Sequence, residues 1–229
     1  MVFIKNIRKI HIKRRFIVSV FKLKNGNSSV NLILFQIYTF LKFSLKTIIM
    51  KILPAYSTLL VIDIQEKLLP KIYDNENVMK NVHWAVDLAR TIGIPSILTE
   101  HFPDKIGTTP AALREKFEEN TIVSKVYFSA VREGNLLDKM EKDRKQIIVV
   151  GTEAHICVQQ TVLDLLELDY SVFILDTGVG TRNPNDKERA LNRMQQNGAE
   201  IITCDMLAFE WLEKAGTELF KTVLHNFIK

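Results

Sequence analysis

The sequence has few cysteines, and it lacks any long apolar run. Its two cysteines, Cys157 and Cys204, give neither a disulfide framework nor a C-x-x-C metal site, so a reducing compartment is the simpler expectation. The uncharged run 25–41 is 17 residues long and is interrupted by several Asn and Ser. Because a membrane-spanning helix needs roughly 20 predominantly apolar residues, we expect no membrane partner. These absences favour a cytoplasmic protein.

Acidic residues are missing from positions 1–49, which contain ten Lys and Arg. The whole chain has 31 Lys and Arg and 26 Asp and Glu, so the remaining residues carry 21 basic side chains against 26 acidic ones. The net charge of +5 and the pI of about 9.1 therefore come from this basic leader. The acidic body offers no basic face interleaved with aromatic residues, so we expect no nucleic-acid partner.

The leader 1–49 allows three interpretations: a membrane anchor, a mitochondrial transit peptide, or an extension that is not part of the working protein. The short uncharged run disfavours the anchor. A transit peptide is rich in Arg and Ser and amphipathic, whereas Lys outnumbers Arg here. We expect the leader to be disordered, cleaved or spurious and residues 50–229 to form the domain. A genuine transit peptide would make the protein mitochondrial.

From position 58 onward, short apolar runs alternate with longer segments of helical periodicity. The run 58–64 is typical of a strand buried on both faces, although Asp63 places a charge near its end. Such alternation predicts an α/β fold with a parallel sheet covered by helices on both faces. The expected strands are 58–64, 95–99, 121–124, 147–150, 171–175 and 200–203, and the expected helices are 75–92, 109–119, 135–142, a segment beginning at 157, 186–197, 206–212 and 217–227.

The segment 147–162 contains the first candidate for chemistry. Four β-branched residues lead into Gly151, and a helical pattern resumes at Cys157 after a short polar turn. A thiol at a helix N-terminus is driven toward thiolate by the helix dipole and the unpaired N–H groups. Cys157 is therefore a candidate nucleophile. The alternative is that Cys157 is a small, inert residue of the interior.

Two further reactive side chains are expected at the same edge of the sheet. Asp63 ends the first strand and Lys125 follows the third, while sites of open α/β sheets form at the carboxyl ends of strands. A nucleophilic thiol needs a base to remove its proton and a cation to stabilise the thiolate, and these residues supply both. Alternatively, Asp63 caps a helix and Lys125 is a solvated lysine at a sheet edge.

Five separated blocks of the sequence resemble the isochorismatase-like cysteine hydrolase superfamily, and within it the metal-free isochorismatase domain-containing proteins. The resemblance covers nearly all of 56–221, in the family's order, and it places the candidate acid, lysine and thiol on the family's catalytic triad. The blocks are LLVIDIQEKL (59–68), ILTEHFPDKIGTT (97–109), SKVYFSA (124–130), GTEAHICVQQTVLDLLE (151–167) and DTGVGTRNPNDKERALNRMQQNGAEI (176–201).

The resemblance implies a Rossmann-like, three-layer α/β/α fold with a six-stranded, mainly parallel sheet. It implies that Cys157 is the nucleophile, that Asp63 is the general base, and that Lys125 holds both in position. It also implies a cis peptide between Thr152 and Glu153. That bond would direct the backbone N–H groups of Glu153 and Cys157 at the oxyanion of the reaction.

Departures from other branches of the family narrow the expected chemistry. Nicotinamidases of this superfamily bind a metal through a D-x-H motif and a further histidine, whereas positions 100–104 here offer only His101, so we expect no metal and no cofactor. True isochorismatases act on a vinyl ether without a cysteine nucleophile, and Cys157 argues against that reaction. The expected function is metal-independent hydrolysis of a small amide, ureide or related C–N substrate through a thioester. A binding or assembly protein with little catalysis is the alternative.

The partners that this resemblance implies are a small-molecule substrate and further copies of the chain in a homo-oligomer. Residues 181–183 either contact substrate or form a solvated turn, and Cys204 is expected in the core. Phe128 fits the core as well as the pocket. The candidates for the substrate pocket are Glu100, His101, Phe128 and His155.

Overall fold

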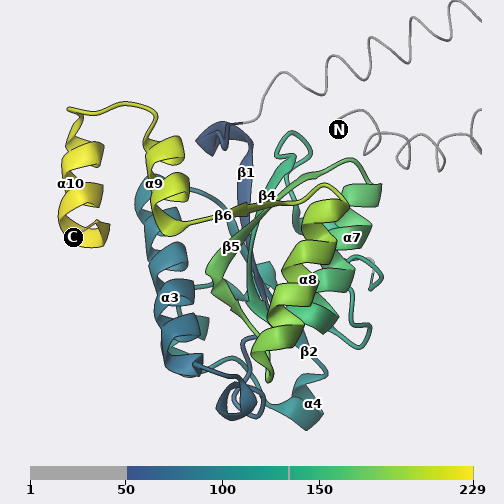
Figure 1. Cartoon of the computed structure of the whole chain (residues 1–229). Helices are drawn as coiled ribbons and strands as arrows, with labels where there is room; N and C mark the ends of the chain where they lie inside the picture. The colour runs from purple at the N-terminus through teal and green to yellow at the C-terminus, as the bar shows by residue number, and fades with distance from the viewer. Residues whose placement is uncertain (1–50, 134, 229) are drawn as a thin grey trace, which may run out of the picture. The chain divides into compact units, whose positions relative to one another are not determined.

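A computed structural model describes residues 51–133 and 135–228 of the chain (Figure 1). The expectations for the leader 1–49 lie outside the described residues. Within the described part, six strands form one sheet in the order β3-β2-β1-β4-β5-β6, and each neighbouring pair is parallel. The strands are β1 (Ser57–Ile62), β2 (Ser96–His101), β3 (Ile122–Lys125), β4 (Gln146–Thr152), β5 (Ser171–Gly180) and β6 (Glu200–Ile202).

Strand β1 shows why a nearly continuous apolar run was needed at this position. Alternate residues of a strand point to opposite faces of the sheet. Accordingly, Leu59 and Val61 pack in one hydrophobic core, while Leu60 and Ile62 pack in the other. All six residues of the strand are buried. The sheet therefore lies between two apolar layers, as parallel sheets do.

Helices cover both faces of the sheet (Figure 1). The helices α3 (Asn75–Ile92) and α9 (Cys204–Leu212) lie on one face, and α7 (Gln159–Glu167) and α8 (Pro184–Gln196) lie on the other. The last helix, α10 (Glu218–Phe227), packs on α3, where the Trp84 indole N–H donates to the Phe227 carbonyl at 3.1 Å. The shorter elements are η1 (Pro54–Tyr56), η2 (Leu69–Lys71), α4 (Pro103–Ile106), α5 (Ala111–Arg114), η3 (Glu119–Thr121), α6 (Leu136–Lys139) and the π-helical turn η4 (Ala154–Val158).

This arrangement confirms the expected Rossmann-like, three-layer α/β/α fold. Several elements differ in length from the sequence prediction. The helix expected at 135–142 is the single turn α6, and the strand expected at 147–150 extends over all of β4. The helix expected at 109–119 is a single turn, α5, because the N–H groups of Lys116 and Phe117 donate to carbonyls three residues back and not four, which ends the α-helical pattern. Strand β5 is longer than expected, because after a register shift its residues Val179 and Gly180 pair with the end of β4.

The strand order reverses between β1 and β4. Strand β1 pairs with β2 on one side and with β4 on the other, so the chain turns in opposite directions from these two central strands. In open α/β sheets, ligands bind at such a switch point, beyond the carboxyl ends of the strands. The carboxyl ends of β1, β2, β3 and β4 lie along this edge of the sheet. Asp63 follows β1, Lys125 ends β3, and Cys157 lies in η4 after β4.

Candidate active site

Asp63 and Lys125 form a buried ion pair at the carboxyl ends of β1 and β3. Their side chains are completely buried, and Lys125 Nζ lies 2.6 Å from Asp63 Oδ2. The other carboxylate oxygen, Oδ1, accepts the Thr99 hydroxyl at 2.6 Å, and Nζ also donates to the Tyr127 carbonyl at 3.3 Å. The interpretations of Asp63 as a helix cap and of Lys125 as a solvated lysine are therefore wrong. Each charge is compensated by the other inside the protein.

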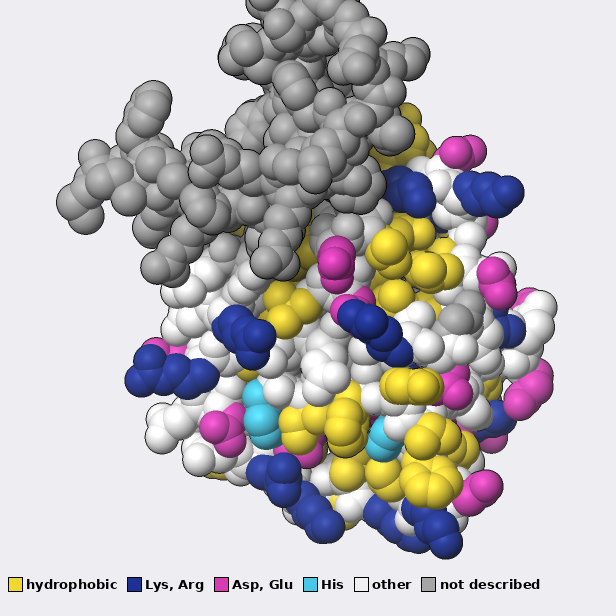
Figure 2. All heavy atoms as spheres, turned by 90° about the vertical axis from the view of Figure 1, so that its right-hand side faces the viewer, with side chains coloured by type: hydrophobic (Ala, Val, Ile, Leu, Met, Phe, Trp, Pro, Cys, Tyr) yellow, Lys and Arg dark blue, Asp and Glu magenta, His cyan; other side chains and the backbone are white. Residues whose placement is uncertain are grey.

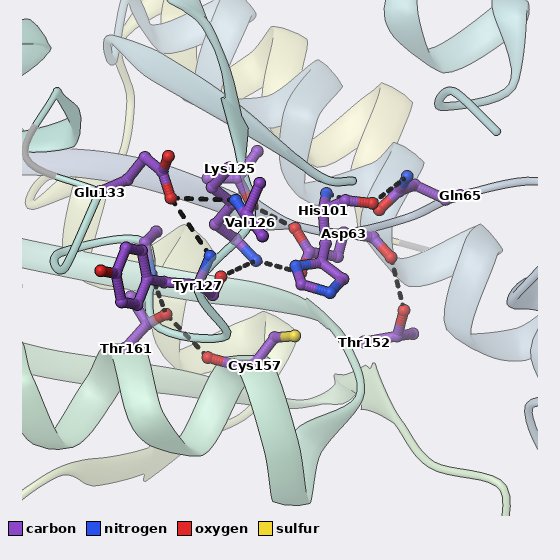
Figure 3. A network of polar contacts seen from close by, with 12 residues as sticks. Asp63, Gln65, His101, Lys125, Val126, Tyr127, Glu133, Thr152, Cys157 and Thr161 are labelled. Carbon is purple, nitrogen blue, oxygen red and sulfur yellow. Dashed lines mark hydrogen bonds and ion pairs between the residues drawn. The ribbon is translucent and has the colours of Figure 1, made fainter. Parts of the chain in front are cut away.

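Cys157 lies in η4, directly across from this pair. Its side chain is 6% exposed and points from the turn toward Asp63 and the ring of His101 (Figure 3). The Cys157 sulfur, an Asp63 carboxylate oxygen and a ring nitrogen of His101 all lie within 4.8 Å of one another. Thr161 fixes the turn, because its hydroxyl donates to the Cys157 carbonyl at 2.7 Å. The structure thus brings the three predicted catalytic side chains together.

The surroundings of Cys157 favour the neutral thiol in the resting site. Burial raises the pKa of the Cys157 thiol well above its usual range, the negative charge of Asp63 raises it further, and Lys125 lowers it by less. These surroundings oppose the expected effect of the helix N-terminus, which favours the thiolate. The arrangement instead places a protonated thiol beside a carboxylate that can accept its proton.

The turn between β4 and η4 is held against the end of β1. Its Thr152–Glu153 peptide is cis, as the resemblance implied. The Thr152 hydroxyl donates to the Asp63 carbonyl at 2.6 Å, which ties the turn to the candidate base. At Gly151, φ is +135° and a Cβ atom would overlap the backbone of Ile62, so only glycine fits between the two strands.

His101 ends β2 and is held by a side chain that the sequence patterns did not single out. The Gln65 amide binds both backbone groups of His101: its oxygen accepts the N–H at 2.8 Å and its nitrogen donates to the carbonyl at 3.0 Å. Burial, and then Lys125, lower the pKa of His101, which favours the neutral imidazole. The sequence signal that could have identified Gln65 is its position as a polar residue two positions after Asp63, next to an apolar strand.

The other predicted pocket residues have different surroundings. Glu100 is buried and holds the loop after β2 through Thr109, and its carboxylate lies 3.5 Å from Arg114 Nε. Phe128 is 49% exposed and stacks on His101 with ring centroids 5.3 Å apart, so the interpretation of Phe128 as a core residue is wrong. His155 approaches α8, with its Nε2 4.0 Å from Asp186 Oδ2. His101 is thus the pocket candidate that lies beside the thiol.

A small cavity of about 100 Å³ lies at the turn that carries Glu153. The Glu153 carboxylate, which is nearly buried, pairs there with Arg182 Nε at 2.8 Å. Of the loop 181–183, Arg182 therefore reaches the cavity, whereas the Asn183 side chain caps α8. The residues lining the cavity are Leu68, Lys71, Ile72, Glu153 and Arg182. Leu68 ends the block 59–68, whereas Lys71 and Ile72 lie beyond it, where no motif marks them.

Cys204 differs from Cys157 in its surroundings. It is half-buried at the start of α9 and packs against the core, as expected. Its sulfur lies 3.3 Å from Asn81 Oδ1 and 3.7 Å from the Thr177 hydroxyl. With a carboxamide and a hydroxyl as its neighbours, Cys204 lacks the buried base and cation that surround Cys157. It is therefore a suitable control cysteine.

Exposed apolar side chains follow the strand ends near the site. Val126 and Tyr127 are each 61% exposed, and their backbone N–H groups donate to the Glu133 carboxylate at 2.9 and 3.2 Å (Figure 3). On the face of the molecule beside α7 and α8, apolar side chains gather around histidines in the lower part (Figure 2). The loop after β3 therefore presents its apolar side chains outward, although its backbone is held.

Comparison with known proteins gives consistent matches over this domain. The model of the isochorismatase domain matches residues 57–206. Isochorismatase family protein 1B of Dictyostelium discoideum is 35% identical over 179 residues, which cover 76% of this chain and 87% of the relative. The structure of the MAR1 ribonuclease from Caenorhabditis elegans superposes with a TM-score of 0.73 at 33% identity, over 78% of this chain and 93% of that one. The YcaC gene product of Escherichia coli, described as an octameric hydrolase of unknown specificity, superposes with a TM-score of 0.73 at 23% identity. This match covers 79% of this chain and 92% of that one.

Proposed function

The chain belongs to the isochorismatase family of hydrolases, and from this we propose that it cleaves a C–N bond of a small amide, ureide or related molecule by metal-independent cysteine catalysis. One observation carries the proposal. A thiol, a buried carboxylate and a buried ammonium group converge at the switch point of the sheet. These are the groups that nucleophilic catalysis by cysteine requires.

In the proposed first step, Cys157 Sγ attacks the carbonyl carbon while its proton passes to the Asp63 carboxylate. The new S–C bond places negative charge on the carbonyl oxygen. Asp63 then gives the proton to the nitrogen, the C–N bond breaks, and ammonia or an amine leaves behind a thioester. Lys125 keeps Asp63 in place and favours the thiolate as it forms.

Water completes the cycle. Asp63 removes a proton from the water as its oxygen attacks the thioester carbon, and the thiolate leaves and recovers a proton from Asp63. In both steps we assign the developing oxyanion to the backbone N–H groups of Glu153, the N-cap of η4, and of Cys157 within η4. Each well-placed donor of this kind contributes about 10²–10³ in rate.

A screen for release of ammonia or amine from amides and ureides tests the proposal. The wild-type chain is compared with Cys157→Ala, and Cys204→Ala serves as the matched control because it removes the other cysteine. We expect the first substitution to lower kcat by at least about 10³-fold and the second to leave it within a factor of about two. Hydrolysis that survives Cys157→Ala unchanged would refute the mechanism.

A ribonuclease is the second candidate, because the protein named as one is 33% identical to this chain. The same enzyme preparations incubated with RNA separate the two functions. Cleavage of RNA that depends on Cys157, without turnover of any amide or ureide, favours the ribonuclease. No turnover of either class favours a binding or assembly protein that retains the fold.

We further propose that the protein is a homo-oligomer in the cytoplasm, or in mitochondria if the leader is a targeting segment. The exposed apolar residues after β3 support an interface, and the structurally similar YcaC product is described as octameric. None of the described helices combines the length and apolar character needed to cross a membrane.

A further inference from the structure

We propose that Asp63, His101 and Cys157 form a site for a thiophilic divalent cation such as Zn²⁺, and that occupation of this site reversibly inhibits the enzyme. Within the described part of the chain, these residues form a cluster of three different metal-ligating side chains. They come from the ends of β1 and β2 and from η4, so three elements converge on one point. The inhibition rests on the proposed function, whereas the binding does not.

The distances fit a tetrahedral ion after small side-chain movements. The donor atoms lie within 4.8 Å of one another. Zinc bonds of about 2.0–2.3 Å to nitrogen, oxygen and sulfur place neighbouring ligand atoms about 3.3–3.8 Å apart. The donor atoms must therefore move closer together by up to about 1.0–1.5 Å. Three protein ligands leave a fourth position for water.

An unpartnered ring nitrogen gives the second, independent observation. Nδ1 of His101 is buried and has no hydrogen-bond partner among the residues that the structure describes. Buried polar atoms are normally satisfied, so this nitrogen is available to a ligand. The His101 backbone is fixed at both ends by the Gln65 amide, so the ring is attached to a firmly held strand end.

The donor set selects the class of metal and limits its affinity. Sulfur and imidazole favour zinc-like ions over Mg²⁺ and Ca²⁺, which prefer oxygen ligands. Lys125 Nζ, 2.6 Å from Asp63 Oδ2, opposes a second positive charge. We therefore expect reversible binding, weaker than in a structural zinc site. On binding, a Zn–S bond forms and the thiol proton leaves to the buffer, so both the nucleophile and the base are blocked.

Titration of the full metal-free chain with Zn²⁺ in a calorimeter, without substrate, tests the binding. We expect an event at about one ion per chain that weakens at least about 10-fold in Cys157→Ala and in His101→Ala. Cys204→Ala and His225→Ala are the matched controls and should bind as the wild type does. A circular dichroism spectrum confirms that each variant is folded.

Co²⁺ provides a measurement that needs no variant. Cobalt in the proposed site should give the near-ultraviolet absorption band of thiolate coordination, and Zn²⁺ should abolish it. Absence of that band, or affinity for Zn²⁺ unchanged by both Cys157→Ala and His101→Ala, overturns the proposal. If Zn²⁺ binds as expected but hydrolysis survives Cys157→Ala, the proposed function fails and the metal site stands. If hydrolysis needs Cys157 and Zn²⁺ does not bind there, the metal site fails and the proposed function stands.

Discussion

At the scale of single residues, Asp63 and Lys125 have two roles that mutation can separate. Both are completely buried and paired at 2.6 Å, so each compensates the charge of the other. Removing one member of such a pair leaves an uncompensated charge in the interior. Replacing both by uncharged groups of similar size removes that penalty but also removes the chemistry.

Asp63→Asn should therefore be less stable and nearly inactive. We expect the free energy of unfolding to fall by about 3–5 kcal/mol, because Lys125 loses its partner, and kcat to fall about 10²–10⁴-fold, because the general base is lost. The double variant Asp63→Asn/Lys125→Met should recover most of the stability and none of the activity. Urea unfolding and ammonia release measure the two effects. A double variant as unstable as the single one would contradict the pairing argument.

The raised pKa of Cys157 predicts how its alkylation depends on pH. A thiol reacts as thiolate, so a raised pKa shifts reactivity to higher pH. In a Cys204→Ser background, the rate with iodoacetamide should still be rising above the ordinary cysteine value of 9.0. In urea the same chain should level off near that value. A plateau below 9.0 in the folded protein would instead show a stabilised thiolate.

At the scale of elements, the junction of β4, the cis turn and η4 positions the nucleophile. Gly151 allows this junction to lie against β1, since a Cβ atom there would overlap the Ile62 backbone. Gly216, between α9 and α10, also has a positive φ, of +82°, but a Cβ atom there meets nothing within 4 Å. Substitution of Gly216 therefore measures the free-energy cost of a positive φ alone, whereas substitution of Gly151 adds the cost of steric overlap with Ile62.

Gly151→Ala should destabilise the fold more than Gly216→Ala. We expect about 1–2 kcal/mol for the positive φ at Gly216, and a further 1–3 kcal/mol or so at Gly151 because the strands must move apart. Hydrolysis should be lost only in Gly151→Ala, since that movement displaces Cys157. Thermal unfolding and ammonia release check these outcomes. Equal stability losses in the two variants would mean that the β1–β4 contact tolerates the added methyl group.

The elements were largely predictable because burial on both faces leaves a strong pattern. The apolar run of β1 and the periodicity of α3 specify a strand and a helix locally, and α3 has the bounds that its sequence indicates. The π-helical turn η4 and the long β5 were not predictable, since both depend on pairing between distant segments. The catalytic candidates could be predicted because sites of open α/β sheets form at the carboxyl ends of the strands. The direction of His155 and the lining of the cavity depend on side-chain packing, which periodicity does not encode.

At the scale of the whole molecule, an exposed apolar surface lies beside the candidate active site. The loop after β3 presents Val126, Tyr127 and Phe128 to solvent beside the site. Contiguous exposed apolar groups of this kind commonly mark an interaction surface. The proposed homo-oligomer would cover them and would place an interface close to the substrate's path.

Light scattering should give a mass that is a multiple of the mature chain at micromolar concentration. Tyr127→Glu should shift this mass toward the monomer, because the interface would have to bury a charge. Tyr73→Glu is the matched control, since Tyr73 is similarly exposed at 64% but lies in the segment before α3. A wild-type mass equal to one chain would contradict the proposed assembly.

Detection of the thioester tests the central claim most directly. The amide or ureide that is turned over fastest is mixed with the enzyme, the reaction is stopped with acid, and the intact protein and its peptides are weighed by mass spectrometry. We predict an added mass equal to the acyl group of the substrate, on the peptide that contains Cys157. Turnover by Cys157→Ala at the wild-type rate, with no acyl adduct on the wild-type chain, would contradict the mechanism.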